Sequence, residues 1–479
     1  MRKYTKGMQI SKHFHELVPG GSHTYSKGND QFPQMSPQII THADGAYCWD
    51  VDGNQYIDWA MGNRVFILGH NNKVVNDAVK KAIDNSTNYT RPGILEYEVA
   101  QFAVDFFPVA EMVKFGKNGS DVTTAAVKLS RAYTNRTHVA VCKQHPFFSI
   151  HDWFIGSTNM NAGVIESERQ YTIGFDYNDI EGVKKMFDQY HNKIACLILE
   201  PVKNDHPCNY DKDETCKEQC EKGICAKGKK NFLTELRDIC TKNGTILIFD
   251  EMISGIRFDI RGAHHLWGVY PDLATYGKCI SNGFSFSMLA GKRDILNLGG
   301  IMHDRERVFL LSQTHGSETV GLAAALATLK ECERVNVNEH IWNLGGQLRK
   351  GFEQLIKEEG VGKYIKLIGF DCNPHILCTK ENGTYWPELH TSFHEEVIDQ
   401  GILIPWISIT YAHTNLELDI TLQALREGLR KIKKSVEMEN IEDSFVGEAV
   451  KPVFRPFNKC KQGRCGRIYT DVEKLSCCK

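Results

Sequence analysis

The sequence predicts an α/β fold built on a mostly parallel sheet, joined to a smaller α+β domain. Helical and strand patterns alternate over about 200 residues from residue 95 onward, which is typical of a parallel sheet covered on both faces. Within this stretch, the apolar and β-branched run Thr245–Phe249 is followed by Asp250 and Glu251, as expected for a buried strand with charges at its C-terminal edge. Residues 340–437 mix both patterns and end in an amphipathic helix that begins at Leu416.

The other elements are predicted from local patterns. Apolar and polar residues alternate on both sides of the turn residues Asp52–Gly53, which predicts a β-hairpin over residues 46–58. Apolar residues at helical spacing predict helices at 74–83, 95–107, 122–132, 232–240 and 319–335. Short apolar runs predict strands at 112–115, 138–142 and 194–199. No internal repeat or low-complexity linker interrupts this order.

Composition limits the function classes. The chain has 479 residues, enough for two or three domains. Its 42% hydrophobic and 24% charged residues are ordinary for a soluble globular protein. A net charge of -2 gives no electrostatic reason to expect nucleic acid or an acidic membrane as partner. No apolar run reaches about 18 residues and the first residues lack the apolar core of a signal peptide, so we expect a cytoplasmic location.

Asp250 and Lys278 are the first candidates for chemistry. Ligands of open α/β sheets bind at the C-terminal strand edge, where Asp250 is expected. Lys278 ends a second short apolar stretch, and a lysine at the rim of a buried sheet can lose its proton and become a nucleophile. The pair suits a pyridoxal 5'-phosphate (PLP) site, with the lysine forming the Schiff base and the aspartate keeping the pyridine nitrogen protonated. The ordinary alternative is that the Asp–Glu pair caps a helix or forms a salt bridge, and that the lysine is a solvated surface charge.

Two further stretches could hold parts of such a cofactor. Asn118–Asp121 follows a predicted strand and opens a helix, so free amides at Gly119 and Ser120 could bind an anion. The same residues could equally form a helix cap without a ligand. Aromatic residues at 147–148 could stack on a planar ring, or could simply pack under a loop. Residues 312–318 precede a predicted helix and contain hydroxyl side chains and a glycine, so they offer a second possible anion site.

Six stretches together resemble the class III aminotransferases, a fold-type I PLP family, and in particular its glutamate-1-semialdehyde 2,1-aminomutase-like group. They follow the family's order and spacing and cover roughly residues 15–437; they are Pro19–Gly21, Gly45–Asp58, Asn118–Asp121, Phe249–Met252, Tyr276–Gly283 and Thr314–Gly316. The resemblance implies a large PLP-binding domain with a mostly parallel seven-stranded sheet, a small domain made from both chain ends, and a homodimer with active sites at its interface.

The resemblance also implies domain boundaries and catalytic residues. Residues 1–60 would contribute to the small domain, 61–318 would form the large domain with a Cys-rich insertion at 203–230, 319–437 would complete the small domain, and 438–479 would form a Cys-containing tail. Lys278 would be the Schiff-base lysine and Asp250 the partner of the pyridine nitrogen.

Five residues would complete the cofactor site by position in the family pattern. Gly119 and Ser120 would hold the phosphate, and Thr314 would reach the phosphate of the neighbouring subunit's cofactor. Phe147 falls where the family places an aromatic residue over the ring, and Met252 where it places an apolar residue beneath it.

Departures from the aminomutase pattern bear on the substrate. Lys27 stands where the aminomutases have an arginine that grips the substrate carboxylate, and lysine cannot form the bidentate fork. Phe147–Ser149 replaces the family's Tyr-His-Gly, and Cys279–Gly283 replaces a glycine-rich run. Glu200, at the end of the strand 194–199, is expected to face the site.

Three functions follow from this pattern. The favoured one is an aminotransferase that moves an amino group from an amino-acid donor to a carbonyl substrate, for which a keto- or aldehydo-sugar of surface-polysaccharide synthesis is a candidate by analogy. The second is the aminomutase itself, which needs no external donor. The third is an inactive, metal-bearing family member, against which the intact Lys278 and Asp250 argue.

The sequence contains 16 cysteines, of which half are scattered singly and half lie in two clusters, one in the insertion and one in the tail. Single cysteines in apolar segments, such as Cys196 and Cys240, are expected to be small core residues. Close spacing in the insertion could suit zinc or an iron–sulfur cluster held by Cys208, Cys216, Cys220 and Cys225. A second group lies in the tail, at Cys460, Cys465, Cys477 and Cys478. Neither spacing matches a well-known signature, so a surface insertion without metal is the alternative.

Overall fold

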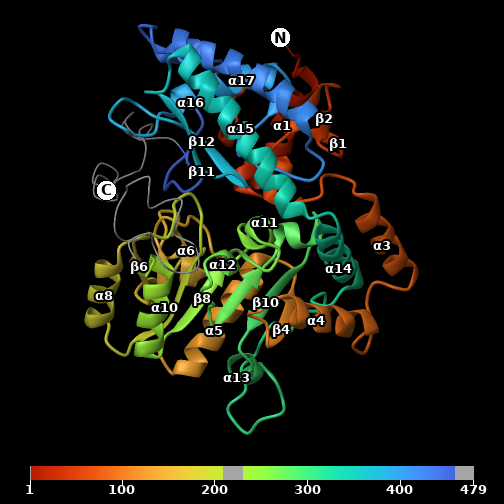
Figure 1. Cartoon of the computed structure of the whole chain (residues 1–479), viewed down its shortest axis with the longest axis vertical. Helices are drawn as coiled ribbons and strands as arrows, with labels where there is room; N and C mark the ends of the chain where they lie inside the picture. Colours follow the sequence, from red (N-terminus) through yellow and green to blue (C-terminus); the bar gives the residue numbers. More distant parts are fainter. Residues whose placement is uncertain (1, 209–229, 459–479) are drawn as a thin grey trace. The chain divides into compact units, whose positions relative to one another are not determined.

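The computed structural model describes residues 2–208 and 230–458, and these divide into two compact units (Figure 1). The larger unit contains Arg64–Ile67 and Lys73–Asn338. The smaller unit contains the described residues up to Asn63, Leu68–Asn72, and those from Glu339 onward. Each unit is described by itself below.

The larger unit is built on a seven-stranded sheet with the strand order β4-β10-β9-β8-β7-β5-β6. Its strands are β4 Met112–Gly116, β5 His138–Cys142, β6 Thr172–Phe175, β7 Ile194–Leu199, β8 Ile246–Asp250, β9 Leu273–Tyr276 and β10 Ser287–Gly291. Only β10 runs antiparallel to its neighbours, so the remaining strands all end at the same edge of the sheet. The predicted α/β class with a mostly parallel seven-stranded sheet is confirmed.

The two central strands explain the apolar runs of the sequence. Every residue of β7 and of β8 is buried, as expected where helices cover both faces of a parallel sheet. Helix α5 packs across the sheet, and α10 packs on β8 and on α8. Helix α14 packs on α3 and α4. These helices are α3 Lys73–Asp84, α4 Ile94–Phe106, α5 Gly119–Thr134, α8 Ile180–Gln189, α10 Phe232–Asn243 and α14 Thr319–Arg334. Shorter helices are α6 Asp152–Ile155, α7 Glu166–Arg169, α11 Gly255–Phe258, α12 Ala263–Leu266 and α13 Arg293–Leu296.

The smaller unit joins segments from the two ends of the chain. Its four-stranded sheet has the order β1-β2-β3-β13, and β13 Ile402–Leu403 pairs in parallel with β3 Gln55–Asp58. The remaining strands are β1 Ile40–Asp44 and β2 Tyr47–Asp50, and a separate hairpin consists of β11 Ile365–Phe370 and β12 Asn373–Cys378. The helices are α1 Thr5–Leu17, α16 Pro387–Asp399 and α17 Asn415–Ser435, with α15 Val337–Glu359 running into this unit from the larger one.

Most predicted elements have the expected position. The hairpin over residues 46–58 turns at Gly53, which has φ of 88°, and β5 and β7 have the predicted bounds. Strand β10 and its antiparallel direction were not predicted. The strand has only five residues, and so short an apolar run does not indicate in which direction it pairs. The predicted domain boundaries remain predictions; α14, expected to start the small domain, packs within the larger unit. No helix in the described ranges is long and apolar enough to cross a membrane.

Candidate active site

Neighbouring strand ends bring Asp250 and Lys278 together. Asp250 is the last residue of β8 and pairs in register with Thr275 of β9. Lys278 follows β9 by two residues and opens a single helical turn, Lys278–Ser281. Each side chain shifts the pKa of the other through its charge, so the two groups share one electrostatic environment. The sequence therefore correctly predicted that both groups lie at the same sheet edge.

Asp250 is a buried carboxylate with one oxygen unused. The backbone N–H of Met252 and the hydroxyl of Thr275 both donate to Oδ1, at 3.1 and 3.0 Å. Oδ2 accepts no hydrogen bond from any described residue. Burial, reinforced by the charge of Glu200, raises the pKa of Asp250 to about 7, although the Lys278 ammonium opposes this shift. A donor placed opposite Oδ2 would relieve an unfavourable burial.

Lys278 is also held without a partner for its charge. Burial lowers the pKa of its amine, while the carboxylates of Asp250 and Glu200 act in the opposite direction. Nζ makes no hydrogen bond or ion pair with a described residue. The backbone at Lys278 has φ of 48°, a left-handed conformation that costs a side-chain-bearing residue about 1–2 kcal/mol. Strain of this kind persists where the surrounding structure fixes it, and it is common at active sites.

Glu251 takes the structural role that the ordinary interpretation gave to the whole Asp–Glu pair. Its carboxylate accepts from His264 Nδ1 at 2.8 Å and from Ser254 Oγ at 2.8 Å. The backbone N–H groups of Ala263 and His264 also donate to it, at 3.1 and 3.0 Å. Glu251 thus fastens the 254–264 segment to the end of β8, while Asp250 stays available.

The first turn of α5 forms a cup of free amides. Oδ2 of Asp121 accepts from the backbone N–H groups of Lys117 and Asn118, at 3.2 and 2.9 Å, so the predicted helix cap is present. The N–H groups of Gly119 and Ser120 donate to no described acceptor. The Ser120 hydroxyl accepts from Ile150 N–H at 3.1 Å and keeps its own hydrogen for another acceptor. The helix cap therefore leaves two amides of the same turn available to an anion, and anion binding there remains a prediction.

Met252 lies against two glycines of this site. A Cβ atom at Gly119 would be 3.0 Å from Met252 Sδ, and one at Gly277 would be 2.5 Å from the same atom. Larger residues at either position would displace the methionine, which is 7% exposed. Gly119 belongs to the cup, and Gly277 directly precedes Lys278. Met252 therefore lies between the two parts of the predicted cofactor site.

The aromatic loop is attached to the cup. Thr123 Oγ1 donates to the carbonyl of Phe148 at 2.7 Å, which fixes the loop to α5. Phe148 is buried, whereas Phe147 is 44% exposed and meets Phe154 edge to face. The exposed ring is the one that the family pattern places over the cofactor, and this role remains a prediction.

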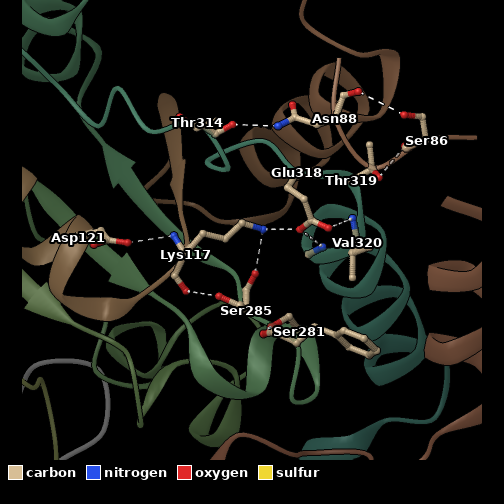
Figure 2. A network of polar contacts seen from close by, with 12 residues as sticks. Ser86, Asn88, Lys117, Asp121, Ser281, Ser285, Thr314, Glu318, Thr319 and Val320 are labelled. Atoms are coloured by element: carbon tan, nitrogen blue, oxygen red, sulfur yellow. Dashed lines mark hydrogen bonds and ion pairs between the residues drawn. The ribbon is translucent and has the colours of Figure 1, made fainter. Parts of the chain in front are cut away.

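Thr314 is held by its backbone and leaves its hydroxyl free. Asn88 Nδ2 donates to the Thr314 carbonyl at 3.0 Å, while the exposed Thr314 hydroxyl has no described partner (Figure 2). Two residues further on, the chain reaches Gly316, and Glu318 then pairs with Lys117 at 2.6 Å. Lys117 precedes the cup, so this ion pair fixes the Thr314 segment to the strand end that carries Gly119.

Glu200 and Arg64 add charges near Lys278. Glu200 is 5% exposed, its backbone N–H donates to His145 Nδ1 at 2.9 Å, and its carboxylate has no described hydrogen bond. Burial raises its pKa, and Lys203, Lys278 and Arg64 oppose the rise. Glu200 is thus buried within electrostatic reach of Lys278, and its role in the site remains a prediction. Arg64 was missed, because a single arginine between a hairpin and a helix belongs to no motif.

The remaining predicted site residues are Lys27 and the cysteines of the insertion. Lys27 is exposed and belongs to the smaller unit, so its substrate role remains a prediction. Cys208 is partly buried, and Cys216, Cys220, Cys225 and the four tail cysteines lie outside the described residues. Within the described ranges, no group of three or more potential metal-binding side chains occurs, so the predicted metal site has no support there. Cys196 and Cys240 are buried core residues, as expected.

Comparisons with known proteins identify the family of the chain. The class-III aminotransferase family matches residues 29–436. A 3-aminobutyryl-CoA aminotransferase of Cloacimonas acidaminovorans (strain Evry) is 27% identical and the match covers 90% of this chain and 98% of the relative. A glutamate-1-semialdehyde 2,1-aminomutase of Desulforamulus reducens is also 27% identical, over 90% of this chain and 99% of the relative.

Solved structures share the fold at lower sequence identity. The PLP internal aldimine form of the FumI protein of Sphingopyxis sp. MTA144 has a TM-score of 0.78 at 22% identity, covering 92% of this chain and 99% of that one. An omega-transaminase of Sphaerobacter thermophilus has a TM-score of 0.77 at 21% identity, covering 89% and 98%. With its family match over most of the sequence, this chain belongs to the class III PLP-dependent aminotransferases.

Proposed function

We propose that the chain binds PLP at Asp250 and Lys278 and uses it to move an amino group from an amino-acid donor to a carbonyl substrate. The observation that carries this proposal is the presence of two unsatisfied groups in one buried place, Oδ2 of Asp250 and Nζ of Lys278. A protonated pyridine nitrogen would supply the donor that Oδ2 lacks. When bound, PLP supplies an electron-withdrawing ring that stabilises the electron pair left when a proton leaves the substrate carbon.

The residues around the pair fit the rest of the cofactor. The free amides of Gly119 and Ser120, at a helix N-terminus, would hold its phosphate. Met252 would contact one face of the ring, and the exposed ring of Phe147 the other. Thr314 would donate its free hydroxyl to the phosphate of a second subunit, which makes a homodimer part of this proposal.

Each charged residue has a definite task. Lys278 Nζ would bind the cofactor's aldehyde carbon and, when released, carry the proton from and to the substrate carbon. Its lowered pKa leaves more of the amine neutral and able to accept that proton near pH 7. Asp250 Oδ2 would keep the proton on the pyridine nitrogen, in a buried site where the interaction is weakly screened.

The carbonyl substrate is proposed to differ from glutamate 1-semialdehyde, because Lys27 replaces the carboxylate-binding arginine of the aminomutases. A keto- or aldehydo-sugar of surface-polysaccharide synthesis is the candidate acceptor. The alternative, a glutamate-1-semialdehyde 2,1-aminomutase, is favoured by the aminomutase relative. Turnover without an external amino donor would select the aminomutase, and turnover that requires a donor would select the aminotransferase.

The replacement Lys278→Ala tests the cofactor assignment. Borohydride treatment of the PLP-loaded protein should attach the cofactor to the peptide that contains Lys278, and the variant should lose both this labelling and turnover. Lys184→Ala, an exposed lysine on α8, is the matched control and should retain both. A Lys278→Ala protein that is still labelled and still turns over would overturn the assignment.

A further inference from the structure

We propose that Arg64 is a specificity-determining residue that binds a carboxylate of the amino donor beside Lys278. The inference deepens the proposed aminotransferase function, on which it rests, by naming the group that distinguishes amino acids from simple amines as donors. No motif in the sequence points to Arg64, and the argument comes from its surroundings in the larger unit.

The guanidinium of Arg64 is partly buried and has no hydrogen-bond partner in the part of the chain that the structure describes. Its Nε atom is buried without a hydrogen-bond acceptor. The other guanidinium nitrogens form no hydrogen bond or ion pair with any described residue either. An arginine has five donor hydrogens in a fixed fork, and burying them unpaired is unfavourable unless a ligand completes them. Arg64 thus has the same feature as Asp250 and Lys278, namely an unused polar group in a buried place.

The segment that carries Arg64 is fixed to the segment that follows Lys278. Asn282 Oδ1 accepts from the Ile67 N–H at 3.0 Å, and Arg257 Nη2 donates to the Phe66 carbonyl at 3.0 Å. A Cβ atom at Gly283 would be 2.5 Å from the Phe66 ring, so these residues touch. Arg64 itself has φ of 64°, in the left-handed region. These contacts therefore hold the backbone of the Arg64 segment against residues that follow Lys278, and Arg64 has a conformation that an unconstrained arginine would avoid.

Charges around Arg64 favour an incoming anion. Its guanidinium acts on the pKa values of both Lys278 and Glu200, so the three side chains share one environment. Burial and the neighbouring Arg257 lower the pKa of Arg64 to about 10, so a second positive group lies close by. Glu200 is the carboxylate that opposes this shift, yet it forms no ion pair with Arg64. An added carboxylate would meet a surplus of positive charge.

The geometry of the Arg64 guanidinium favours a carboxylate as its ligand. A planar guanidinium binds a carboxylate through two parallel hydrogen bonds, which fixes orientation as well as adding affinity. A carboxylate held near Lys278 would place the amine of the same molecule within reach of the reacting centre. A donor amine that has no carboxylate would leave the Arg64 donors unpaired.

Kinetics with two matched donors test the proposal. Alanine and ethylamine differ by a carboxylate, and we expect Arg64→Gln to raise the KM for alanine about 10- to 100-fold while changing kinetics with ethylamine less than threefold. Arg64→Lys should recover only part of the loss, because the ammonium keeps the charge but not the fork. Arg430→Gln, an exposed arginine on α17, is the matched control and should not change either donor.

A binding measurement separates this inference from the reaction itself. The affinity of the PLP-loaded protein for glutarate, which carries carboxylates but no amine, should fall at least tenfold in Arg64→Gln, with the cofactor's visible spectrum unchanged. Equal glutarate affinity in Arg64→Gln and the unchanged protein would overturn the proposal, as would a loss seen in Lys27→Gln but not in Arg64→Gln. Failure of the aminotransferase function would show instead as unlabelled Lys278, and glutarate binding would still decide the role of Arg64.

Discussion

Asp250 and Glu251 are adjacent at the end of β8, yet their carboxylates have opposite surroundings. Glu251 is surrounded by donors, with His264, Ser254 and two backbone N–H groups directed at it. Asp250 receives two bonds on one oxygen only, and the nearby charges of Lys278 and Glu200 are not tied to it by hydrogen bonds. Because side chains alternate across a strand end, consecutive residues point into different environments.

This difference in hydrogen bonding distinguishes a carboxylate that stabilises the fold from one that is available to a ligand. A fully paired buried carboxylate contributes to stability, because removing it leaves several donors unsatisfied. An underpaired one costs stability in the absence of a ligand and is retained for function. Lys278, Glu200 and Arg64 share the second condition with Asp250 among the described residues, and we propose that together they form the ligand site of the larger unit.

The largest expected effect is on catalysis by Asp250→Asn. The amide cannot stabilise a positive pyridine nitrogen, so kcat should fall about 100- to 1000-fold, the range seen when one preorganised electrostatic contact is removed. Steady-state turnover of PLP-loaded protein measures this, with the visible absorbance of the bound cofactor as the control for occupancy. A kcat within threefold of the unchanged protein would show that Asp250 does not act on the ring.

Glu251→Gln should instead affect stability. The amide nitrogen would face donors that now meet a carboxylate, and breaking a buried charged network costs about 3–5 kcal/mol in free energy of unfolding. Denaturant unfolding of the cofactor-free variant measures the loss, and kcat of the molecules that remain folded should change far less than in Asp250→Asn. Unchanged stability would mean that the 254–264 segment does not depend on Glu251.

The pH dependence of stability should differ between the cofactor-free protein and Asp250→Asn. The pKa of Asp250 is raised to about 7 in the folded state, above the usual value near 4 of an unfolded aspartate. Stability from this group is therefore fully present below about pH 4 and is lost as the pH rises through 7, by about 1.4 kcal/mol per pH unit between the two pKa values. Unfolding free energies at several pH values should show this loss in the unchanged protein and not in the variant; parallel curves would contradict it.

The sequence predicted the central part of the molecule well. The strand at 245–249, its terminal Asp250, and Lys278 after the next apolar stretch could be assigned because buried parallel strands have distinctive apolar runs and their ends meet at one edge. The first turn of α5 could also be predicted, because cap residues and Gly119 directly follow a strand. Local patterns of this kind need no knowledge of distant contacts.

Other features depended on contacts far apart in the sequence. The antiparallel β10, the packing of α14 on α3 and the pairing of β13 with β3 join segments whose order gives no sign of their contact. The candidate substrate residues Lys27 and Glu200 were predicted from their positions, and no feature of the sequence was a reason to select Arg64. An isolated charged side chain carries no local signature of whether it is paired, so its role cannot be read before the structure is known.

By itself, the sequence determined the α/β architecture, the family and the two residues proposed for the central chemistry, because hydrophobic periodicity and short motifs are properties of neighbouring residues. The tertiary structure alone decided which polar groups are satisfied. It gave Glu251 its donors, and among the described residues it left Oδ2 of Asp250, Nζ of Lys278 and the guanidinium of Arg64 without a hydrogen-bond partner. The reason is physical: burial and hydrogen bonding depend on what distant segments place around a group, and those terms set both its charge and its availability to a ligand.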